Sequence, residues 1–126
     1  MKILVIDREA INRTVMAFLL QDLNHEVTES ISCAEGLQKL ETKKFDIVIT
    51  SVRTSESSED KPTGFDVVQK VKNLRKDGWK TQVILSANTL SEDDQTLCLL
   101  HQPDAFLQKP FEQSYFRVLI RAMLTD

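Results

Sequence analysis

The segment Ile3-Leu4-Val5-Ile6, followed at once by Asp7-Arg8-Glu9, decides how this chain folds. Four consecutive apolar residues, three of them β-branched, predict a short buried strand that ends at a charged edge. Similar runs predict four more strands, at 26–28, 47–50, 83–85 and 106–107. A stretch with helical spacing of apolar residues follows each run. Strands that alternate with helices indicate an α/β fold, with a parallel sheet covered on both faces through right-handed crossovers.

The helices are predicted from apolar residues three and four positions apart, which mark one face of each helix. These residues are Ile11, Val15, Phe18, Leu19, Leu37, Leu40, Val67, Val68, Val71, Leu97, Leu100, Phe116, Leu119, Ile120 and Met123. Gly64 marks the start of the third helix, and Asp77 with Gly78 marks its end. Ser91, followed by the acidic residues 92–94, predicts a capped start for the fourth helix.

The composition indicates a single domain with its own core. The chain has 126 residues, of which 41% are hydrophobic, enough to bury roughly two-thirds of the surface of the unfolded chain. Its net charge is -3 and its basic residues are scattered, which argues against direct binding of nucleic acid. The first apolar run is too short for a signal peptide, and no segment is long enough to span a membrane. We therefore expect a cytoplasmic protein.

The cysteines and histidines do not predict a metal site. Cys33 and Cys98 lack the spacing of a ligand set, so we expect free thiols in a reducing compartment. Cys33 follows Ser32 at a predicted helix start, where the dipole can lower a thiol pKa, but a role as a small packed residue is favoured. His25 and His101 have no ligand partner at a useful spacing, which favours surface or capping roles.

Polar residues follow the carboxyl ends of four predicted strands. They are Asp7, Ser51, Ser86 and Lys109. In open α/β sheets, ligands bind outside these strand ends. We therefore expect the four side chains to converge on one crevice.

Over essentially its whole length the chain resembles the CheY-like receiver domain of two-component response regulators. The most specific parts are the first strand with Asp7, the stretch 83–88, and Phe106-Leu107-Gln108-Lys109-Pro110-Phe111. The resemblance implies a doubly wound, flavodoxin-like (βα)5 fold with strand order 2-1-3-4-5, formed by residues 1–126 as one receiver-like domain. It also implies a signalling module rather than an enzyme, in which an aspartate accepts a phosphoryl group beside a magnesium ion.

Two positions depart from the pattern that the family implies. The resemblance places the acidic pair at Asp7 and Arg8, the phosphoacceptor aspartate at Ser51, the switch hydroxyl at Ser86, the switch aromatic at Phe106 and the site lysine at Lys109. Arg8 and Ser51 are not acids, so Asp7, Arg8, Ser51 and Lys109 together carry a formal charge of +1. Magnesium requires several oxygen ligands, and a positive pocket repels it. We expect a degenerate pocket in which magnesium binding is lost or weak.

The two departures suggest particular local arrangements. The Arg8 guanidinium is expected near the metal position, paired with Asp7 or with a loop carboxylate, and the alternative is that it points into solvent. Ser51 cannot form an acyl phosphate, and as a nucleophile it would need Asp7 or Lys109 as a base; a small polar residue at a strand end is favoured. Lys109 is expected to neutralise Asp7, and in the family Pro110 follows a cis peptide bond.

The segment 52–63 is longer than the corresponding connection in the family. It is polar and acidic, and its carboxylates are Glu56, Glu59 and Asp60. One hypothesis is that these carboxylates approach Arg8 and replace part of the missing acids. A solvated surface loop is the commoner outcome for such a segment.

The resemblance assigns partner binding to the face formed by the fourth helix, the fifth strand and the fifth helix. Apolar side chains replace the polar ones of the family there, at Leu97, Leu100, Tyr115 and Leu119. Leu99, Phe116 and Ile120 are expected to face the core, and Phe106, which has no hydroxyl, is expected to point inward. An exposed apolar patch of this kind indicates an interface, unless a different helix register buries it.

These expectations favour a phosphorylation-independent interaction module of a bacterial two-component or phosphorelay pathway. Its partner would be a histidine kinase, a phosphotransfer protein or an output protein, or a second copy bound through the fourth and fifth helices. We expect no nucleic acid, membrane or cofactor. Two alternatives remain: a slow phospho-switch that uses the loop acids, and a crevice that binds an anion or phosphorylated metabolite through Arg8, Lys109, Ser51 and Ser86.

Overall fold

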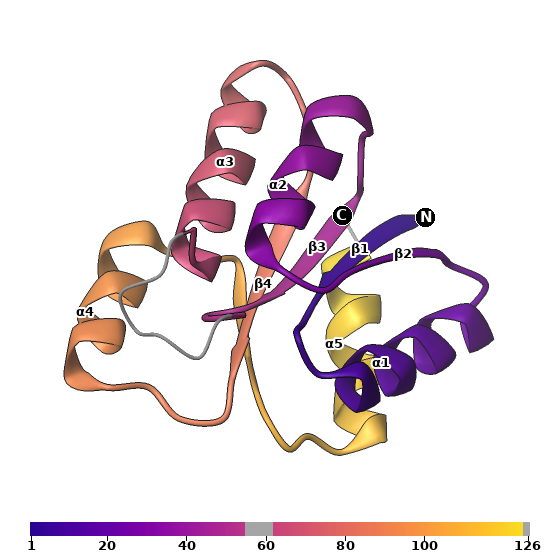
Figure 1. The fold of residues 1–126 in the computed structure, drawn as a ribbon. Helices are drawn as coiled ribbons and strands as arrows, with labels where there is room; N and C mark the ends of the chain where they lie inside the picture. The colour runs from indigo at the N-terminus through magenta and orange to yellow at the C-terminus, as the bar shows by residue number, and fades with distance from the viewer. Residues whose placement is uncertain (55–61, 125–126) are drawn as a thin grey trace.

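The computed structural model describes residues 1–54 and 62–124, and in these ranges it shows the predicted alternation of strands and helices (Figure 1). The strands are β1 (Lys2–Ile6), β2 (Glu26–Ser30), β3 (Ile47–Ser51), β4 (Gln82–Ala87) and β5 (Ala105–Gln108). The helices are α1 (Ala10–Asp22), α2 (Cys33–Thr42), α3 (Gly64–Lys76), α4 (Glu92–His101) and α5 (Gln113–Leu124). No helix within the described ranges has both the length and the apolar character needed to cross a bilayer.

The five strands form one parallel sheet in the order β2-β1-β3-β4-β5. This order and the surrounding helices confirm the predicted flavodoxin-like fold. The register pairs Ile6 with Thr50 and Ser51 with Ser86. Because neighbouring parallel strands end at the same edge, the two serines lie next to each other at the carboxyl edge of the sheet.

Helices cover both faces of the sheet, with α2, α3 and α4 on one side and α1 and α5 on the other (Figure 1). Strand β1 has a continuous apolar run because it contributes to a core on each face of the sheet. Leu4 and Ile6 belong to the core on the side of α2, α3 and α4, and Ile3 and Val5 belong to the core on the side of α1 and α5. A strand with helices on both faces needs apolar side chains at every position.

The predicted inner face of α1 is partly wrong. Ile11 and Phe18 are 77% and 66% exposed, whereas Met16, Leu19 and Leu20 are buried. Helix α1 carries apolar residues on both sides, so their spacing alone did not identify the side that packs on the sheet.

The start of α3 lies directly against the end of β3. The helix begins at Gly64, as predicted, and Thr63 caps it by accepting a hydrogen bond from Phe65 N, while the Asp66 carboxylate accepts one from Thr63 N. A Cβ atom at Gly64 would overlap the Ser51 carbonyl oxygen. Glycine therefore allows α3 to approach the carboxyl edge of the sheet.

Candidate functional site

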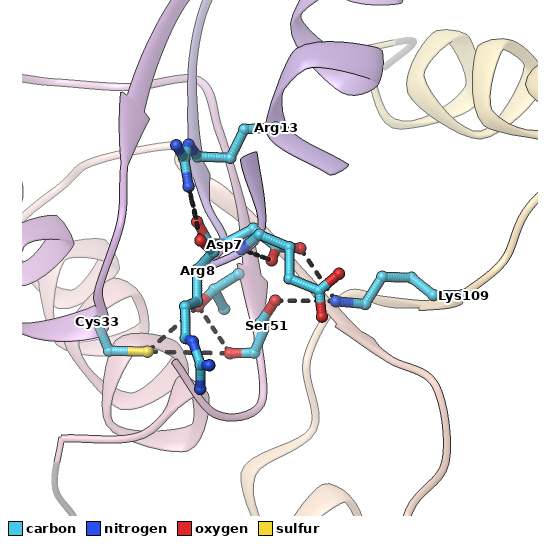
Figure 2. A network of polar contacts seen from close by, with 8 residues as sticks. Asp7, Arg8, Arg13, Cys33, Ser51 and Lys109 are labelled. Carbon is cyan, nitrogen blue, oxygen red and sulfur yellow. Dashed lines mark hydrogen bonds and ion pairs between the residues drawn. The ribbon is translucent and has the colours of Figure 1, made fainter. Parts of the chain in front are cut away.

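Asp7, Ser51 and Lys109 meet at the carboxyl edge of the sheet (Figure 2). Lys109 Nζ lies 3.0 Å from Asp7 Oδ2 and 3.1 Å from Ser51 Oγ. The side chains of Asp7 and Lys109 are only 4% and 11% exposed, so this ion pair is largely removed from water. The predicted contact of Lys109 with Asp7 is confirmed, and the Lys109–Pro110 peptide bond is cis as the resemblance implied.

The turn between β1 and α1 holds Asp7 in place. Asp7 Oδ1 accepts a hydrogen bond of 2.9 Å from Glu9 N. Arg13 Nη1 donates to the carbonyl oxygens of Asp7 and Arg8, at 2.7 and 3.0 Å (Figure 2). Arg13 Nε lies 3.3 Å from Glu29 Oε1. Sequence reasoning did not identify Arg13, for which the only signal was a basic residue one turn into the helix that follows the strand.

Arg8 is exposed in the structure, and Lys109 contacts the Asp7 carboxylate, which also accepts a hydrogen bond from the Glu9 amide. The predicted ion pair between Arg8 and Asp7 stays a prediction. The other predicted partners of Arg8 were Glu56, Glu59 and Asp60. They fall at 55–61, outside the described residues.

A crevice of about 290 Å³ opens beside this ion pair. Ser51, Ser86 and Lys109 line it, as predicted. Ser86 is only 1% exposed, and within the described part of the chain its Oγ has no hydrogen-bond partner. The four polar residues at the strand ends thus gather in one place, while the roles that the resemblance implies for them stay predictions.

The crevice has a second ion pair that sequence reasoning missed. Arg53, just after β3, forms a bidentate ion pair with Asp94 in the first turn of α4. Nη1 donates to Oδ2 at 2.8 Å and Nη2 donates to Oδ1 at 2.9 Å. The Arg53 guanidinium lowers the pKa of Asp94, and hydrogen bonding with Ser91 lowers it further. Ser91 Oγ also accepts a hydrogen bond from Asp94 N, which confirms the predicted cap. No local pattern predicts a pair whose members are 41 residues apart.

Three residues added by the structure change the charge of the site. Glu9, Arg53 and Asp94 line the crevice together with Lys109. Among the described residues, three carboxylates and three cations now cancel. Their formal charge is zero, rather than the +1 expected from four residues: Asp7, Glu9, Asp94, Arg8, Arg53 and Lys109. A neutral site has no electrostatic preference for an anion.

Asp7 is a buried acid at the position where the family resemblance implies a magnesium ligand. Both oxygens of the Asp7 carboxylate already accept hydrogen bonds, and the Lys109 ammonium lies 3.0 Å from one of them. A hard divalent cation needs several oxygen ligands and is repelled by an ammonium group at this distance. Residues 1–54 and 62–124 contain no group of three or more His, Cys, Asp or Glu side chains able to hold a metal ion.

Cys33 is a packed residue at the start of α2. Its side chain is fully buried, with Sγ 3.8 Å from Thr50 Oγ1, and burial raises the pKa of the thiol. The alternative in which the helix dipole lowers this pKa is wrong, because desolvation is the larger effect. Burial also raises the pKa of Cys98. Both thiols are free.

The predicted partner face is apolar and exposed, but only some of the residues predicted to form it are exposed. Leu100 and Tyr115 are 72% and 53% exposed, as predicted, whereas Leu97 and Leu119 are partly buried against the two cores. Leu99, expected inside, is 78% exposed. Phe116 and Ile120 are buried, as predicted.

Phe106 does not point inward as expected. It is 36% exposed and lines a groove of about 600 Å³ together with Cys98 and Leu99 of α4. Leu107, the next residue of β5, is the one that enters the core, because successive residues of a strand point to opposite faces. The exposed apolar residues on α4, β5 and α5 are therefore Leu99, Leu100, Phe106, Tyr115 and Val118.

Residues 3–121 match the response regulator receiver domain family, and the chain belongs to this family. It is a receiver domain of two-component signalling. Receiver domains are signalling modules, generally without enzymatic activity, that interact with histidine kinases and other signalling proteins.

Among curated proteins, the chain is 25% identical over 125 residues to hybrid signal transduction histidine kinase L of Dictyostelium discoideum. The match covers 95% of this chain but only 7% of that kinase, so the chain spans a small part of its relative. Among solved structures, a CheY-like receiver domain protein from Methanospirillum hungatei superimposes with a TM-score of 0.81 at 20% identity, covering 96% of this chain and 90% of that one.

The receiver domain of a signal transduction histidine kinase from Syntrophus aciditrophicus superimposes with a TM-score of 0.82 at 18% identity, covering 98% of this chain and 89% of that one. At these identities the solved structures establish the fold.

Proposed function

We propose that this receiver domain has a silent phosphorylation pocket and acts as a phosphorylation-independent interaction module. The observation that carries the proposal is the Lys109 ammonium, which contacts the Asp7 carboxylate and the Ser51 hydroxyl together. Ser51 ends β3, where the family resemblance implies the phosphoacceptor aspartate. A hydroxyl at this position cannot form an acyl phosphate, and the buried Asp7 carboxylate is neutralised by the lysine.

The surroundings of Ser51 also argue against an activated serine. Its Oγ lies 3.1 Å from Lys109 Nζ, and an ammonium group donates hydrogen bonds but has no lone pair to take a proton. Asp7 binds that same ammonium and the Glu9 amide. A nucleophilic serine requires a general base in hydrogen-bond contact, and neither neighbour serves as one.

The pair of Arg53 and Asp94 supports a single conformation of the domain. Two charge-assisted hydrogen bonds join Arg53, the second residue after β3, to the first turn of α4. The Asp94 side chain is only 7% exposed, so the contact is partly shielded from water. A partner that docks on α4 would then meet one fixed surface.

That surface is the apolar patch on α4, β5 and α5. Leu99 and Phe106 line a groove of about 600 Å³, and Leu100, next to Leu99 on α4, also exposes an apolar side chain. Apolar patches of this kind mark protein interfaces. The proposed partner is a histidine kinase, a phosphotransfer protein or an output protein of the pathway, or a second copy of the chain.

Labelling with a small phosphodonor tests the silent pocket. We expect no gain in intact mass when the protein is incubated with acetyl phosphate and magnesium. The control restores both missing acids in one protein, as Arg8→Asp with Ser51→Asp, and this variant should gain one phosphoryl group. Stable labelling of the unaltered protein within 55–61 would instead support the slow phospho-switch.

An anion-binding crevice is a second candidate, supported by the buried Ser86 Oγ that has no partner among the described residues. The zero net charge of the site weakens it. Phosphate titration followed by amide NMR distinguishes the two candidates, because an anion site requires saturable shifts at Ser86 and Lys109.

A further inference from the structure

A second hollow, of about 520 Å³, lies at the opposite edge of the sheet, where β1, β3 and β4 begin. Residues 42–46 form one wall and residues 78–81 form the other, and Lys2 completes the lining. These two segments follow α2 and α3, whose carboxyl ends lie at the same end of the molecule (Figure 1).

The hollow is strongly basic. Four lysines from three separate segments line it, and among the described residues Asp46 is the only lining carboxylate: Lys2, Lys43, Lys44 and Lys80. The lining thus carries a formal charge of +3 in a chain whose net charge is -3. Basic residues that look scattered in the sequence gather here in the fold.

These lysine charges are not compensated within the described part of the chain. None of the four ammonium groups forms an ion pair there, and Lys44 Nζ instead lies 5.3 Å from the centroid of the Trp79 ring. The Asp46 carboxylate accepts a hydrogen bond of 2.7 Å from the Lys2 backbone amide. Positive charges that converge and outnumber the negative charges beside them favour the binding of a multivalent anion.

The walls of the hollow are joined by hydrogen bonds. Thr81 Oγ1 donates to the Phe45 carbonyl oxygen at 2.5 Å, Asp46 N donates to Lys2 O at 2.7 Å, and Gln82 N donates to Asp46 O at 3.0 Å. Phe45 and Thr81 are buried, at 4% and 2% exposed. A ligand therefore meets walls that are already in place, which lowers the entropic cost of binding, while the four lysine side chains on them are exposed.

We propose that this hollow binds a small molecule that carries a chain of phosphate groups, such as a nucleoside triphosphate or free polyphosphate. Lysine ammonium groups bind phosphate as point charges, and the volume is in the range of small-molecule sites. Half-buried Trp79 belongs to the same lining, and its ring lies 5.3 Å from Lys44 Nζ. The site is separate from the crevice at Lys109 and does not depend on the silent pocket.

Trp79 makes the test direct, because it is the only tryptophan of the chain. Its fluorescence should change saturably when inorganic tripolyphosphate is added at low salt, with a dissociation constant in the millimolar range or below. Titration with a nucleoside triphosphate distinguishes the two ligand sources. If the nucleoside triphosphate and tripolyphosphate bind with equal affinity, the hollow recognises the phosphate chain alone. If the nucleotide binds more tightly, the base also contributes to binding.

The diagnostic variant is Lys43→Gln with Lys80→Gln, which leaves Lys44 over the Trp79 ring. We expect it to weaken binding about tenfold. The matched control, Lys72→Gln with Lys76→Gln, removes the same charge from α3 outside the hollow and should weaken binding less than about threefold. The proposal would be overturned if Trp79 fluorescence showed no saturable change, or if both double variants weakened binding equally. It would also be overturned if a polyglutamate peptide, an anion without phosphate, bound the hollow and tripolyphosphate did not displace it.

Discussion

At the scale of single residues, Lys109 determines the chemistry of the site. Its ammonium lies within hydrogen-bond distance of Asp7 Oδ2 and Ser51 Oγ. A carboxylate as buried as Asp7 is costly unless it is paired and hydrogen-bonded. Lys109 therefore has a structural role that does not require phosphorylation.

Replacing Lys109 by methionine should expose that role. The Lys109→Met variant leaves the buried Asp7 carboxylate without its cation, so we expect the free energy of unfolding to fall by roughly 3 to 5 kcal/mol. Urea denaturation at neutral pH measures the loss, and adding Asp7→Asn should recover part of it. Lys72→Met, which removes an ammonium group from the surface of α3, should cost less than about 0.5 kcal/mol. Equal losses in the two lysine variants would contradict this role.

The sequence predicted only part of this arrangement. Asp7, Ser51, Ser86 and Lys109 were predicted to meet, because each follows a recognisable strand and parallel strands end at one edge. The partners of Arg53 and Asp94 depend on side-chain conformations and on the position of α4, which local pattern does not encode. The contact of Lys109 with Asp7 was predicted, because the family resemblance places both residues in one pocket.

At the scale of elements, the strands were easier to predict than the helix faces. A strand buried on both sides needs only a continuous apolar run, as in β3 with its five buried residues. Helix α4 carries Leu97, Leu99 and Leu100 on different sides, and only the packed structure shows that Leu97 is the partly buried one. Apolar periodicity identifies a face only when the other faces are polar.

The contact between Arg53 and α4 predicts a dependence of stability on pH. Arg53 holds the pKa of Asp94 below its ordinary value of 3.8, so the pair stabilises the fold above that value and loses its effect as the pH falls through the lowered pKa. At neutral pH, Arg53→Gln should reduce the free energy of unfolding by roughly 1 kcal/mol, since Arg53 is partly exposed. Urea denaturation across the acid range should show the difference from the unaltered protein vanish.

Arg117→Gln is the matched control for this pH series. Its guanidinium lies 4.0 Å from Asp22, whose side chain is 61% exposed, so stability should change little at any pH. A loss in Arg53→Gln that persists after Asp94 is protonated would show that the arginine acts by packing rather than through its charge.

At the scale of the whole molecule, three surfaces differ in character. The carboxyl edge of the sheet is a neutral crevice, the opposite edge is a basic hollow, and α4 with β5 and α5 presents the apolar patch. Only the first of these surfaces corresponds to the phosphorylation chemistry that the family resemblance implies. We propose that the other two surfaces bind their ligands without phosphorylation.

The apolar patch predicts weak self-association in the absence of another partner. We expect the mean mass from sedimentation equilibrium to rise with protein concentration, and Leu100→Glu to abolish the rise because it places a charge in the patch. Phe18→Glu is the control, since Phe18 on α1 is exposed to a similar degree, 66% against 72% for Leu100, but lies outside the patch. A mass that stays monomeric at high concentration would leave another protein as the only candidate partner of this face.

The most direct test of the silent pocket is an amide NMR titration with magnesium and then with beryllofluoride, a mimic of the acyl phosphate. We predict no shifts at millimolar ligand around Asp7, Ser51, Ser86 and Lys109, and saturable shifts in the variant that combines Arg8→Asp with Ser51→Asp. Saturable shifts in the unaltered protein that extend to Phe106 would contradict the account and show a working phosphorylation switch.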